Sequence, residues 1–353
     1  MKKTLAKNEA VILFPSLLMK WDRKKNQRKM PWKGIKDPYK IWLSEIILQQ
    51  TRVEQGEPYY ISFIATYPTI CDLAKADEQA VFKLWQGLGY YNRCRNMLES
   101  AKYICNVCNG IFPSEYSAIL ALKGVGEYTA AAVASFAYNL SYAVVDGNVV
   151  RVLSRAFALK DNYFDAKGKK EIQFLAQSLI DKKKPGLYNQ AIMDLGASIC
   201  KPTNPICTIC PLQEICQAFK QQTISLFPIK KERKQLKERR FHFFILENKT
   251  HFFITQRNEK DIWKGLYTPL MIESEKISQQ LLPTFLDFEK ISKPLILTQL
   301  LTHQRITGYF YPYNANVVVP KAETSLIKIK KEMLTKYPLP RMIASFFEKK
   351  NYL

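Results

Sequence analysis

Four cysteines close together in the sequence form its densest group of side chains that could bind a metal. They follow the spacing Cys-x6-Cys-x2-Cys-x5-Cys, at Cys200, Cys207, Cys210 and Cys216, and prolines interrupt the segment. A loop of this kind can bring four thiolates around one centre, either a zinc ion or an iron–sulfur cluster, and the ligand type alone does not distinguish them. A second pair, Cys105-x2-Cys108, lies in a helical pattern, where we expect two buried thiols.

A glutamate near the start of the chain has surroundings that suit acid catalysis. Asp37 and Pro38 have the signature of an N-cap and a first helical residue, which places Glu45 two turns into a helix. Apolar residues such as Ile41 and Trp42 lie one turn before it. Burial among them disfavours the charged form and raises the pKa of Glu45, as a general acid near neutral pH requires.

A second carboxylate, Asp146, has the opposite surroundings. It immediately precedes a helix that we expect Asn148 to cap, so the amide dipoles favour the ionised form of Asp146. One protonated acid and one lasting anion form the arrangement that cleaves glycosidic bonds through an oxocarbenium-like transition state. Taken singly, each has a simpler explanation: Glu45 as a helix-surface glutamate and Asp146 as part of an Asp-Gly turn.

A glycine motif, Leu-Lys-Gly-Val-Gly-Glu-Tyr-Thr at residues 122–129, lies between two helical patterns. Gly124 and Gly126 allow a tight hairpin whose backbone N–H groups can bind a phosphate at a helix N-terminus. A Gly-x-Gly sequence alone is common in helix–helix turns. The small residues that follow, Ala-Ala-Ala-Val-Ala, strengthen the interpretation because they allow close helix packing.

The composition favours a polyanionic partner. With 53 Lys and Arg against 31 Asp and Glu, the chain of 353 residues has a formal net charge of +22, which fits nucleic acid or an anionic membrane surface. A lysine-rich genome is the alternative explanation. No run of eighteen apolar residues predicts a membrane span, and the cysteines lack the even scatter of a secreted disulfide framework, so we expect a reduced, cytoplasmic protein. All three histidines lie beyond residue 240, which excludes imidazole catalysis from the first two-thirds.

The elements that must position these groups change type along the chain. Helical periodicity runs from about residue 8 to 228, in segments at 38–50, 78–85, 92–107, 115–122, 128–138, 149–158, 169–181 and 187–199. Residues 229–240 have seven basic and two acidic side chains, which predicts an exposed linker. Short β-branched and aromatic runs at 241–246, 251–255, 307–313 and 316–319, followed by an amphipathic stretch at 340–349, then predict a small α+β domain.

Several strings occur together in one order: MPW at 30–32, WLSEIILQQT at 42–51, GLGYY at 87–91, LKGVGEYTA at 122–130, DGNVVRVLSR at 146–155 and NQAIMDLGA at 189–197, followed by the cysteine loop. Through them the chain resembles the helix-hairpin-helix DNA glycosylase superfamily, and within it the MutY-type adenine DNA glycosylases. The resemblance implies a mainly α catalytic region over 1–228, with a six-helix barrel at about 30–140 and an iron–sulfur subdomain from 1–29 and 141–228. The linker 229–240 and a Nudix-like 8-oxoguanine-recognition domain, 241–353, would follow.

The resemblance also implies the function. A monofunctional glycosylase of this family flips adenine out of double-stranded DNA, opposite 8-oxoguanine or guanine, and hydrolyses its N-glycosidic bond in base excision repair. It implies a cytoplasmic, nucleoid-associated monomer with a [4Fe-4S] cluster on the four cysteines. Glu45 would protonate the base, Asp146 would stabilise the sugar cation, and Tyr128 and Asn148 would position them. The implied DNA contacts are Gln50, Thr51, Leu88, Tyr90, Gly124, Val125, Gly126, Gln190, Thr302 and His303.

Three positions refine or weaken the resemblance. Endonuclease III-like members have a Schiff-base lysine after the hairpin, where this chain has Tyr128 and therefore no amine. The string DIWKGLY at 261–267 resembles the Nudix-like domain, but the hydrolase signature is missing, since Met271 follows Gly265 by six residues; we infer base reading without pyrophosphate hydrolysis. The family's Phe-Ser-His loop is Leu-Thr-His here, with Thr302 in place of serine.

Two other functions remain possible from the sequence. An endonuclease III-type glycosylase would act on oxidised pyrimidines and nick the strand. A non-catalytic DNA-binding module would have salt-dependent affinity for DNA without releasing a base.

Overall fold

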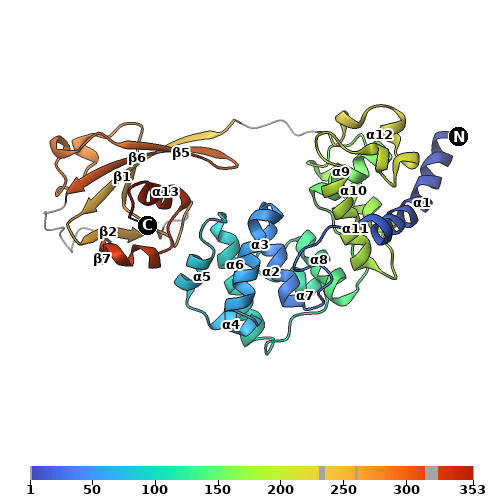
Figure 1. Ribbon diagram of the computed structural model, residues 1–353, viewed down its shortest axis with the longest axis horizontal. Helices are drawn as coiled ribbons and strands as arrows, with labels where there is room; N and C mark the ends of the chain where they lie inside the picture. Colours follow the sequence, from blue (N-terminus) through green and yellow to red (C-terminus); the bar gives the residue numbers. More distant parts are fainter. Residues whose placement is uncertain (1, 230–234, 259–260, 315–324, 353) are drawn as a thin grey trace. The chain divides into compact units, whose positions relative to one another are not determined.

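The protein divides into two compact units. The computed structural model describes residues 2–229, 235–258, 261–314 and 325–352 (Figure 1). Unit 1 comprises Met1–Lys75 and Asn96–Glu232, and unit 2 comprises Ala76–Arg95 and Arg233–Leu353. Unit 2 thus includes a segment from the middle of the helical half, which the sequence had placed in the helical barrel.

Unit 1 is helical, as predicted, and every predicted helix is found with ends within three residues of the expected ones. Its helices are α1 (Lys2–Lys25), α2 (Pro38–Leu48), α3 (Val53–Thr66), α4 (Ile70–Lys75), most of α6 (Tyr91–Asn106), α7 (Tyr116–Leu120), α8 (Glu127–Tyr138), α9 (Gly147–Phe157), α10 (Ala166–Leu179), α11 (Pro185–Ser198) and α12 (Gln217–Lys220). Short 3-10 turns at Cys207–Ile209 and Gln213–Ile215 lie within the cysteine loop, and a third at Ile224–Leu226 follows it. The remaining predicted helix, α5 (Glu78–Leu84), belongs to unit 2.

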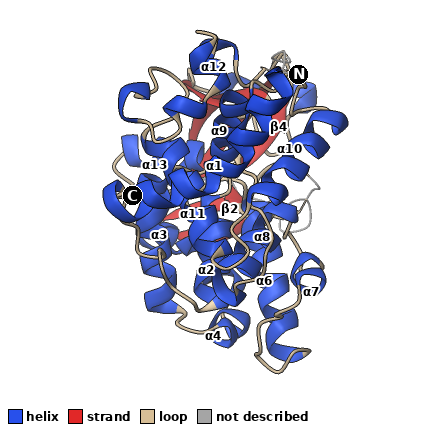
Figure 2. Cartoon of the chain, turned by 90° about the vertical axis from the view of Figure 1, so that its right-hand side faces the viewer, coloured by secondary structure: helices blue, strands red, loops and turns tan. Residues whose placement is uncertain are grey.

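One core of unit 1 joins the N-terminal helix to helices distant in sequence. Phe14, Leu18 and Trp21 of α1 are buried with residues of α9, α10 and α11, and these four helices pack against one another (Figure 2). Burying apolar area on this scale is the main stabilising contribution to such a core. The start of the chain is therefore part of the fold of unit 1. None of the helices in the described ranges combines the length and apolar character needed to span a bilayer.

A disulfide bond within unit 1 overturns one prediction. Cys71 of α4 is bonded to Cys105 of α6, with 34 residues of sequence separation. The expected pair of buried thiols at Cys105 and Cys108 is therefore wrong, because Cys105 is oxidised and Cys108 is a partly exposed free thiol. The sequence pointed to an entirely reduced chain, and this bond departs from that expectation.

Unit 2 contains one mixed sheet with a helix on it, which confirms the predicted α+β class. The strands are β1 (Lys237–Glu247), β2 (His251–Gln256), β3 (Tyr267–Thr268), β4 (Leu270–Glu273), β5 (Leu295–Leu300), β6 (Gln304–Asn314) and β7 (Ile327–Lys330). Their order is β3-β2-β1-β6-β5, where β1 and β6 are parallel and the other pairs are antiparallel; β4 also pairs with β1, and β7 with β2. The predicted run 316–319 lies outside the described residues, and β5 was not predicted.

Stacked aromatic rings attach the C-terminal helix α13 (Arg341–Lys349) to this sheet. Phe310 of β6 stacks on Phe243 of β1 at 4.7 Å between ring centroids and on Phe346 of α13 at 4.5 Å. Aromatic pairs at this distance add to the free energy gained from burial alone. The amphipathic stretch predicted at 340–349 is thus a helix whose apolar face covers the sheet.

Strand β1 begins earlier than the sequence indicated. The linker expected over 229–240 ends before Lys237, because residues 237–240 already pair with β6. Arg239 is buried and binds two carboxylates, those of Asp261 and Glu273, each at 2.6 Å. A buried arginine paired in this way is held by the sheet and is not free to contact phosphates.

Candidate active site

Glu45 lies on α2 in the surroundings that the sequence predicted. Asp37 caps the helix by accepting hydrogen bonds from the backbone N–H groups of Tyr39 (2.9 Å) and Lys40 (3.3 Å), and Pro38 occupies the first turn. Only 6% of Glu45 is exposed. Burial raises its pKa to about 7; a hydrogen bond with Tyr128 opposes this rise and the charge of Asp146 adds to it. Glu45 therefore holds a proton over much of the neutral range.

Asp146 is itself the cap of α9, which corrects the prediction that Asn148 caps that helix. Its carboxylate accepts hydrogen bonds from the backbone N–H of Val149 (2.7 Å) and from Asn148 Nδ2 (2.6 Å). The pKa of Asp146 is nevertheless raised, because burial outweighs these hydrogen bonds and the charge of Arg151. The backbone amides of the helix do lower the pKa of Asp146, as expected, but burial raises it by more.

Tyr128 is influenced by both carboxylates. It follows Glu127, the first residue of α8, and both Glu45 and Asp146 act electrostatically on its hydroxyl. Burial is the larger cause of its strongly raised pKa, with the two carboxylates next. The phenol is therefore neutral and can donate a hydrogen bond to Glu45. Glu45, Tyr128 and Asp146 thus influence one another although the outer two are about a hundred positions apart in the sequence.

The glycine hairpin has the predicted geometry. Gly124 has φ +76°, and a Cβ there would be 2.7 Å from the Cβ of Asn96. Gly126 is the N-cap of α8, and Val125 is buried in the turn. A side chain at residue 124 would be both strained and obstructed, so the turn between α7 and α8 depends on glycine there.

A cavity of about 140 Å³ opens beside Glu45. It lies between α2, α11 and the segment that precedes α2, and its lining includes Trp32, Lys33, Ile41, Glu45, Phe136 and Gln190. The walls are mainly apolar, with a few polar groups, as in sites that bind a flat, partly polar ligand. Gln190, predicted to contact an extruded base, therefore shares one cavity with the predicted acid.

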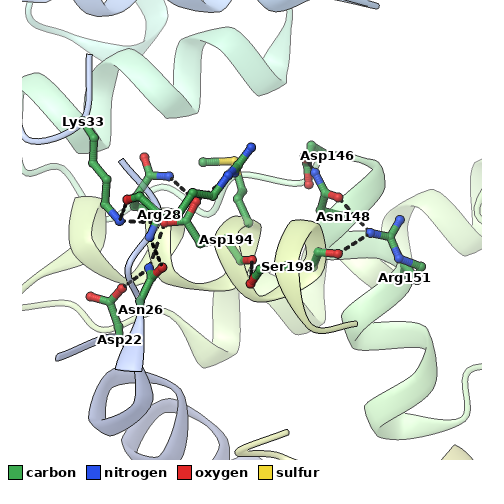
Figure 3. A network of polar contacts seen from close by, with 12 residues as sticks. Asp22, Asn26, Arg28, Lys33, Asp146, Asn148, Arg151, Asp194 and Ser198 are labelled. Atoms are coloured by element: carbon green, nitrogen blue, oxygen red, sulfur yellow. Dashed lines mark hydrogen bonds and ion pairs between the residues drawn. The ribbon is translucent and has the colours of Figure 1, made fainter. Parts of the chain in front are cut away.

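A buried ionic network around Asp194 orients Gln190; Figure 3 shows Asp194 with Asn26, Arg28 and Lys33. The fully buried side chain of Asp194 binds Arg28 at 2.9 Å and Lys33 at 2.8 Å. Asn26 Nδ2 donates to it at 2.9 Å, and Gln190 Nε2 donates to it at 3.0 Å. Because one N–H of the Gln190 amide is bound to Asp194, the orientation of this side chain is fixed by a charged partner.

Arg151 fixes the position of Asn148, the residue that hydrogen-bonds to Asp146 (Figure 3). Its guanidinium donates to Asn148 Oδ1 (2.8 Å), to the Gly196 carbonyl (2.7 Å) and to the Cys200 carbonyl (2.6 Å). Asn148 in turn donates to Asp146. The chain of contacts fixes the amide of Asn148 with its nitrogen toward the carboxylate.

The four predicted thiol ligands line one small cavity of about 30 Å³. Arg155 adjoins it, since its guanidinium donates to Cys200 Sγ (3.5 Å) and its carbonyl accepts from Cys216 Sγ (3.4 Å). Burial raises the pKa values of Cys207, Cys210 and Cys216. Across the ranges that the structure describes, no three Cys, His, Asp or Glu side chains are close enough to hold a single metal ion. The donors nonetheless fit a thiolate-bound centre, because all four belong to one cavity.

The predicted DNA-contact residues have unequal exposure. Gln50 is exposed at the end of α2 with φ 55°, and Thr51 follows it. In unit 2, Tyr90 is exposed and its hydroxyl contacts Thr302 in the turn between β5 and β6, where His303 is also exposed. Leu88 is buried, so its side chain is in the core and the prediction of a DNA contact there is not supported.

The sequence did not reveal the network around Asp194. Asn26, Arg28 and Lys33 are more than 160 residues from their partner Asp194, and no spacing rule connects them. One signal was present: Gln190 and Asp194 are four residues apart, so they lie on the same face of a helix. Trp32 was noted within a string but without a role, and it lines the cavity.

The chain is similar to known DNA repair proteins. The family model described as "HhH-GPD superfamily base excision DNA repair protein" matches residues 43–182. An adenine DNA glycosylase of Buchnera aphidicola (subsp. Acyrthosiphon pisum) is 37% identical over 255 residues, which cover 72% of this chain and 73% of that protein. The human adenine DNA glycosylase is 39% identical over 218 residues, 59% of this chain and 40% of that protein.

Solved structures support the helical fold. A thermostable thymine-DNA glycosylase has a TM-score of 0.56 and 31% identity, covering 61% of this chain and 99% of that one. An endonuclease III in a non-covalent DNA complex has a TM-score of 0.51 at 20% identity, covering 61% and 97%, which shows a shared fold. Given the extent of its likeness to the curated relatives, this chain belongs to the adenine DNA glycosylases and is an N-glycosylase that excises adenine from DNA in base excision repair.

Proposed function

We propose that the enzyme removes adenine paired with 8-oxoguanine or guanine, by hydrolysis at the Glu45–Asp146 pair. The observation that carries the proposal is a buried glutamate with a pKa of about 7, beside a second carboxylate and at a cavity that also includes Gln190. Such an acid is half protonated near neutral pH, which suits proton transfer to a base.

In the first step, Glu45 donates its proton to N7 of the extruded adenine. The C1′–N9 bond then breaks with its electron pair on the base, and positive charge develops on the sugar. Asp146 stabilises this cation, and its negative charge is shared with Val149 and Asn148 through the hydrogen bonds at 2.7 and 2.6 Å. Asn148 and Tyr128 act as positioning residues for the carboxylate.

In the second step, water completes the hydrolysis. The Glu45 carboxylate accepts a proton from water while the water oxygen bonds to C1′, which restores the acid. Tyr128 cannot form an imine with the sugar because it has no amine. The enzyme therefore releases free adenine and leaves an abasic site with an intact strand.

Recognition of adenine is assigned to Gln190. Its nitrogen donates to Asp194, so its amide oxygen can accept from the N6 amino group of adenine, as amides do when they read this base. Guanine has a carbonyl oxygen where adenine has the N6 amino group. This oxygen would face the amide oxygen of Gln190, and because both atoms are acceptors, no hydrogen bond could form.

The remaining predicted residues are proposed to hold the duplex. The hairpin at Gly124–Gly126 would bind the backbone through its N–H groups, and Gln50 and Tyr90 would fill the stack after the adenine leaves it. Thr302 and His303 would read the base opposite. The hydroxyl groups of Tyr90 and Thr302 are in contact. This contact supports a joint role for Tyr90 in the base stack and for the turn with Thr302 and His303 in reading the opposite base.

A [4Fe-4S] cluster is proposed for the thiol cavity. Cys200, Cys207, Cys210 and Cys216 would hold it as thiolates, and the cluster would contribute loop structure and one-electron redox capacity. The support is their common cavity, with Arg155 beside it. Iron and sulfide analysis of the purified protein, with a Cys207→Ser variant as control, tests this assignment.

The test of the proposed function is the release of free adenine. Four matched duplexes should be compared, with adenine opposite 8-oxoguanine, guanine, cytosine and thymine, under single-turnover conditions. We expect excision with the first two and little with the others. Equal rates on all four, or a protein–DNA adduct trapped by borohydride, would contradict the proposal.

A further inference from the structure

The loop between α9 and α10 is fixed by contacts among its own residues. The side chain of Asn162 accepts a hydrogen bond from the backbone N–H of Phe164 (3.0 Å), and Asp165 caps α10 by accepting from Gly168 N–H (2.7 Å). Gly168 is so close to the loop that a Cβ there would lie 2.1 Å from the carbonyl oxygen of Asn162. The loop therefore packs directly on the first turn of α10.

This loop holds two adjacent aromatic rings in different environments. Tyr163 is partly buried against the core of unit 1; burial raises its pKa, and the charges of Lys169, Asp146 and Glu127 act on its hydroxyl. Phe164 meets the ring of Tyr163 edge-on at 5.8 Å and is 55% exposed. Tyr163 is thus close enough to Asp146 for the charge of that carboxyl group to act on it, and its neighbour Phe164 presents a large apolar ring to solvent.

An ion pair connects the same region to the glycine hairpin. Lys169 of α10 binds Glu127 at 2.9 Å, and Glu127 is the residue between the hairpin and Tyr128. A second lysine, Lys167, binds Asp161 of the loop at 2.9 Å. The loop is therefore connected to the hairpin through α10, and a DNA strand held by the hairpin with its sugar at Asp146 would pass near Phe164.

From this arrangement we infer that Phe164 stacks on a nucleotide next to the extruded adenosine and thereby favours the extruded state. Removing one base from the stack exposes the faces of its neighbours, and an aromatic side chain can cover such a face whatever the base. The inference rests on the proposed position of the target sugar at Asp146. It adds a DNA contact from a loop that the sequence motifs do not include.

The test compares Phe164→Ala with Phe164→Trp, Phe164→Leu and Phe174→Ala in the full-length protein. Phe174 is the matched control, because it is a phenylalanine of α10 with 79% exposure. Affinity should be measured with a duplex that contains a non-hydrolysable 2′-fluoro-adenosine opposite 8-oxoguanine. Fluorescence of 2-aminopurine next to the target reports stacking of the neighbouring base directly.

We expect Phe164→Ala to weaken binding of the analogue duplex about tenfold, within the range for loss of one stacked aromatic. Tryptophan should restore both the affinity and the quenched 2-aminopurine signal, and leucine should not. Unchanged affinity in Phe164→Ala, or an equal loss in Phe174→Ala, would overturn the inference. Adenine release by the unaltered enzyme tests the proposed function separately, since that reaction does not require Phe164.

Discussion

Replacing Glu45 by Gln removes the ionisable group at this position but keeps its shape. The variant therefore tests two effects of the carboxyl group, on the pH dependence of stability and on excision. Burial raises the pKa of Glu45 from its ordinary value of 4.5 to about 7, so the folded protein binds the proton more tightly than the unfolded chain does. The carboxyl group therefore stabilises the fold fully below pH 4.5 and loses this contribution as the pH rises through 7. The loss is about 3 kcal/mol, at about 1.4 kcal/mol per tenfold change in proton affinity.

Glutamine has nearly the same shape and does not ionise. We therefore expect the free energy of unfolding of Glu45→Gln, relative to that of the unaltered enzyme, to rise by about 2 to 3 kcal/mol between pH 5 and pH 8. Urea denaturation followed by the circular dichroism of the helices measures this difference. Glu54→Gln, which changes an exposed glutamate on the neighbouring helix α3, is the matched control and should show no such trend.

The same titration governs activity. Above pH 7 the protonated fraction of Glu45 falls about tenfold per pH unit, so the single-turnover excision rate of the unaltered enzyme should fall as the pH rises. Glu45→Gln should bind the duplex and release no adenine at any pH. A stability difference that does not depend on pH, or normal excision by the variant, would refute the assignment of Glu45 as the proton donor.

Three further perturbations follow from the contacts described above. Asp194→Asn should lower the free energy of unfolding by about 2 kcal/mol and should slow excision. The loss is smaller than for a fully buried ion pair because Arg28 and Lys33 are both partly exposed. An unchanged urea midpoint would contradict this expectation. Gly124→Ala should cost about 1 to 2 kcal/mol because of its positive φ and the close Asn96 side chain, and should weaken duplex binding in a mobility-shift titration. Reducing the Cys71–Cys105 bond should cost about 4 kcal/mol for a loop of this length, whereas Cys71→Ser should show no response to reductant.

Local signals predicted much of the helical unit. The pair Asp37 and Pro38 placed the start of α2, and with it the depth of Glu45 in an apolar helix, because capping and burial depend on residues within a few positions. The hairpin at Gly124 was predictable for the same reason. Asp146 was correctly placed at the start of α9, although its role as the cap was assigned to Asn148.

Local sequence signals could not predict the long-range contacts. The partners of Asp194 come from the segment after α1, and a bond between Cys71 and Cys105 depends on how α4 meets α6, which no local pattern determines. Leu88 was assigned to DNA from its motif, but its burial is a property of the folded unit. The sign of the pKa change of Asp146 likewise depended on burial by distant residues, which outweighed the nearby amides.

The bond between Cys71 and Cys105 encloses α5 and the GLGYY segment in a covalent ring. A protease that cuts once between these cysteines therefore produces two new chain ends, yet both fragments remain joined as one molecule until a reductant is added. Nicked protein would migrate as two pieces on a reducing gel and as a single species on a non-reducing one.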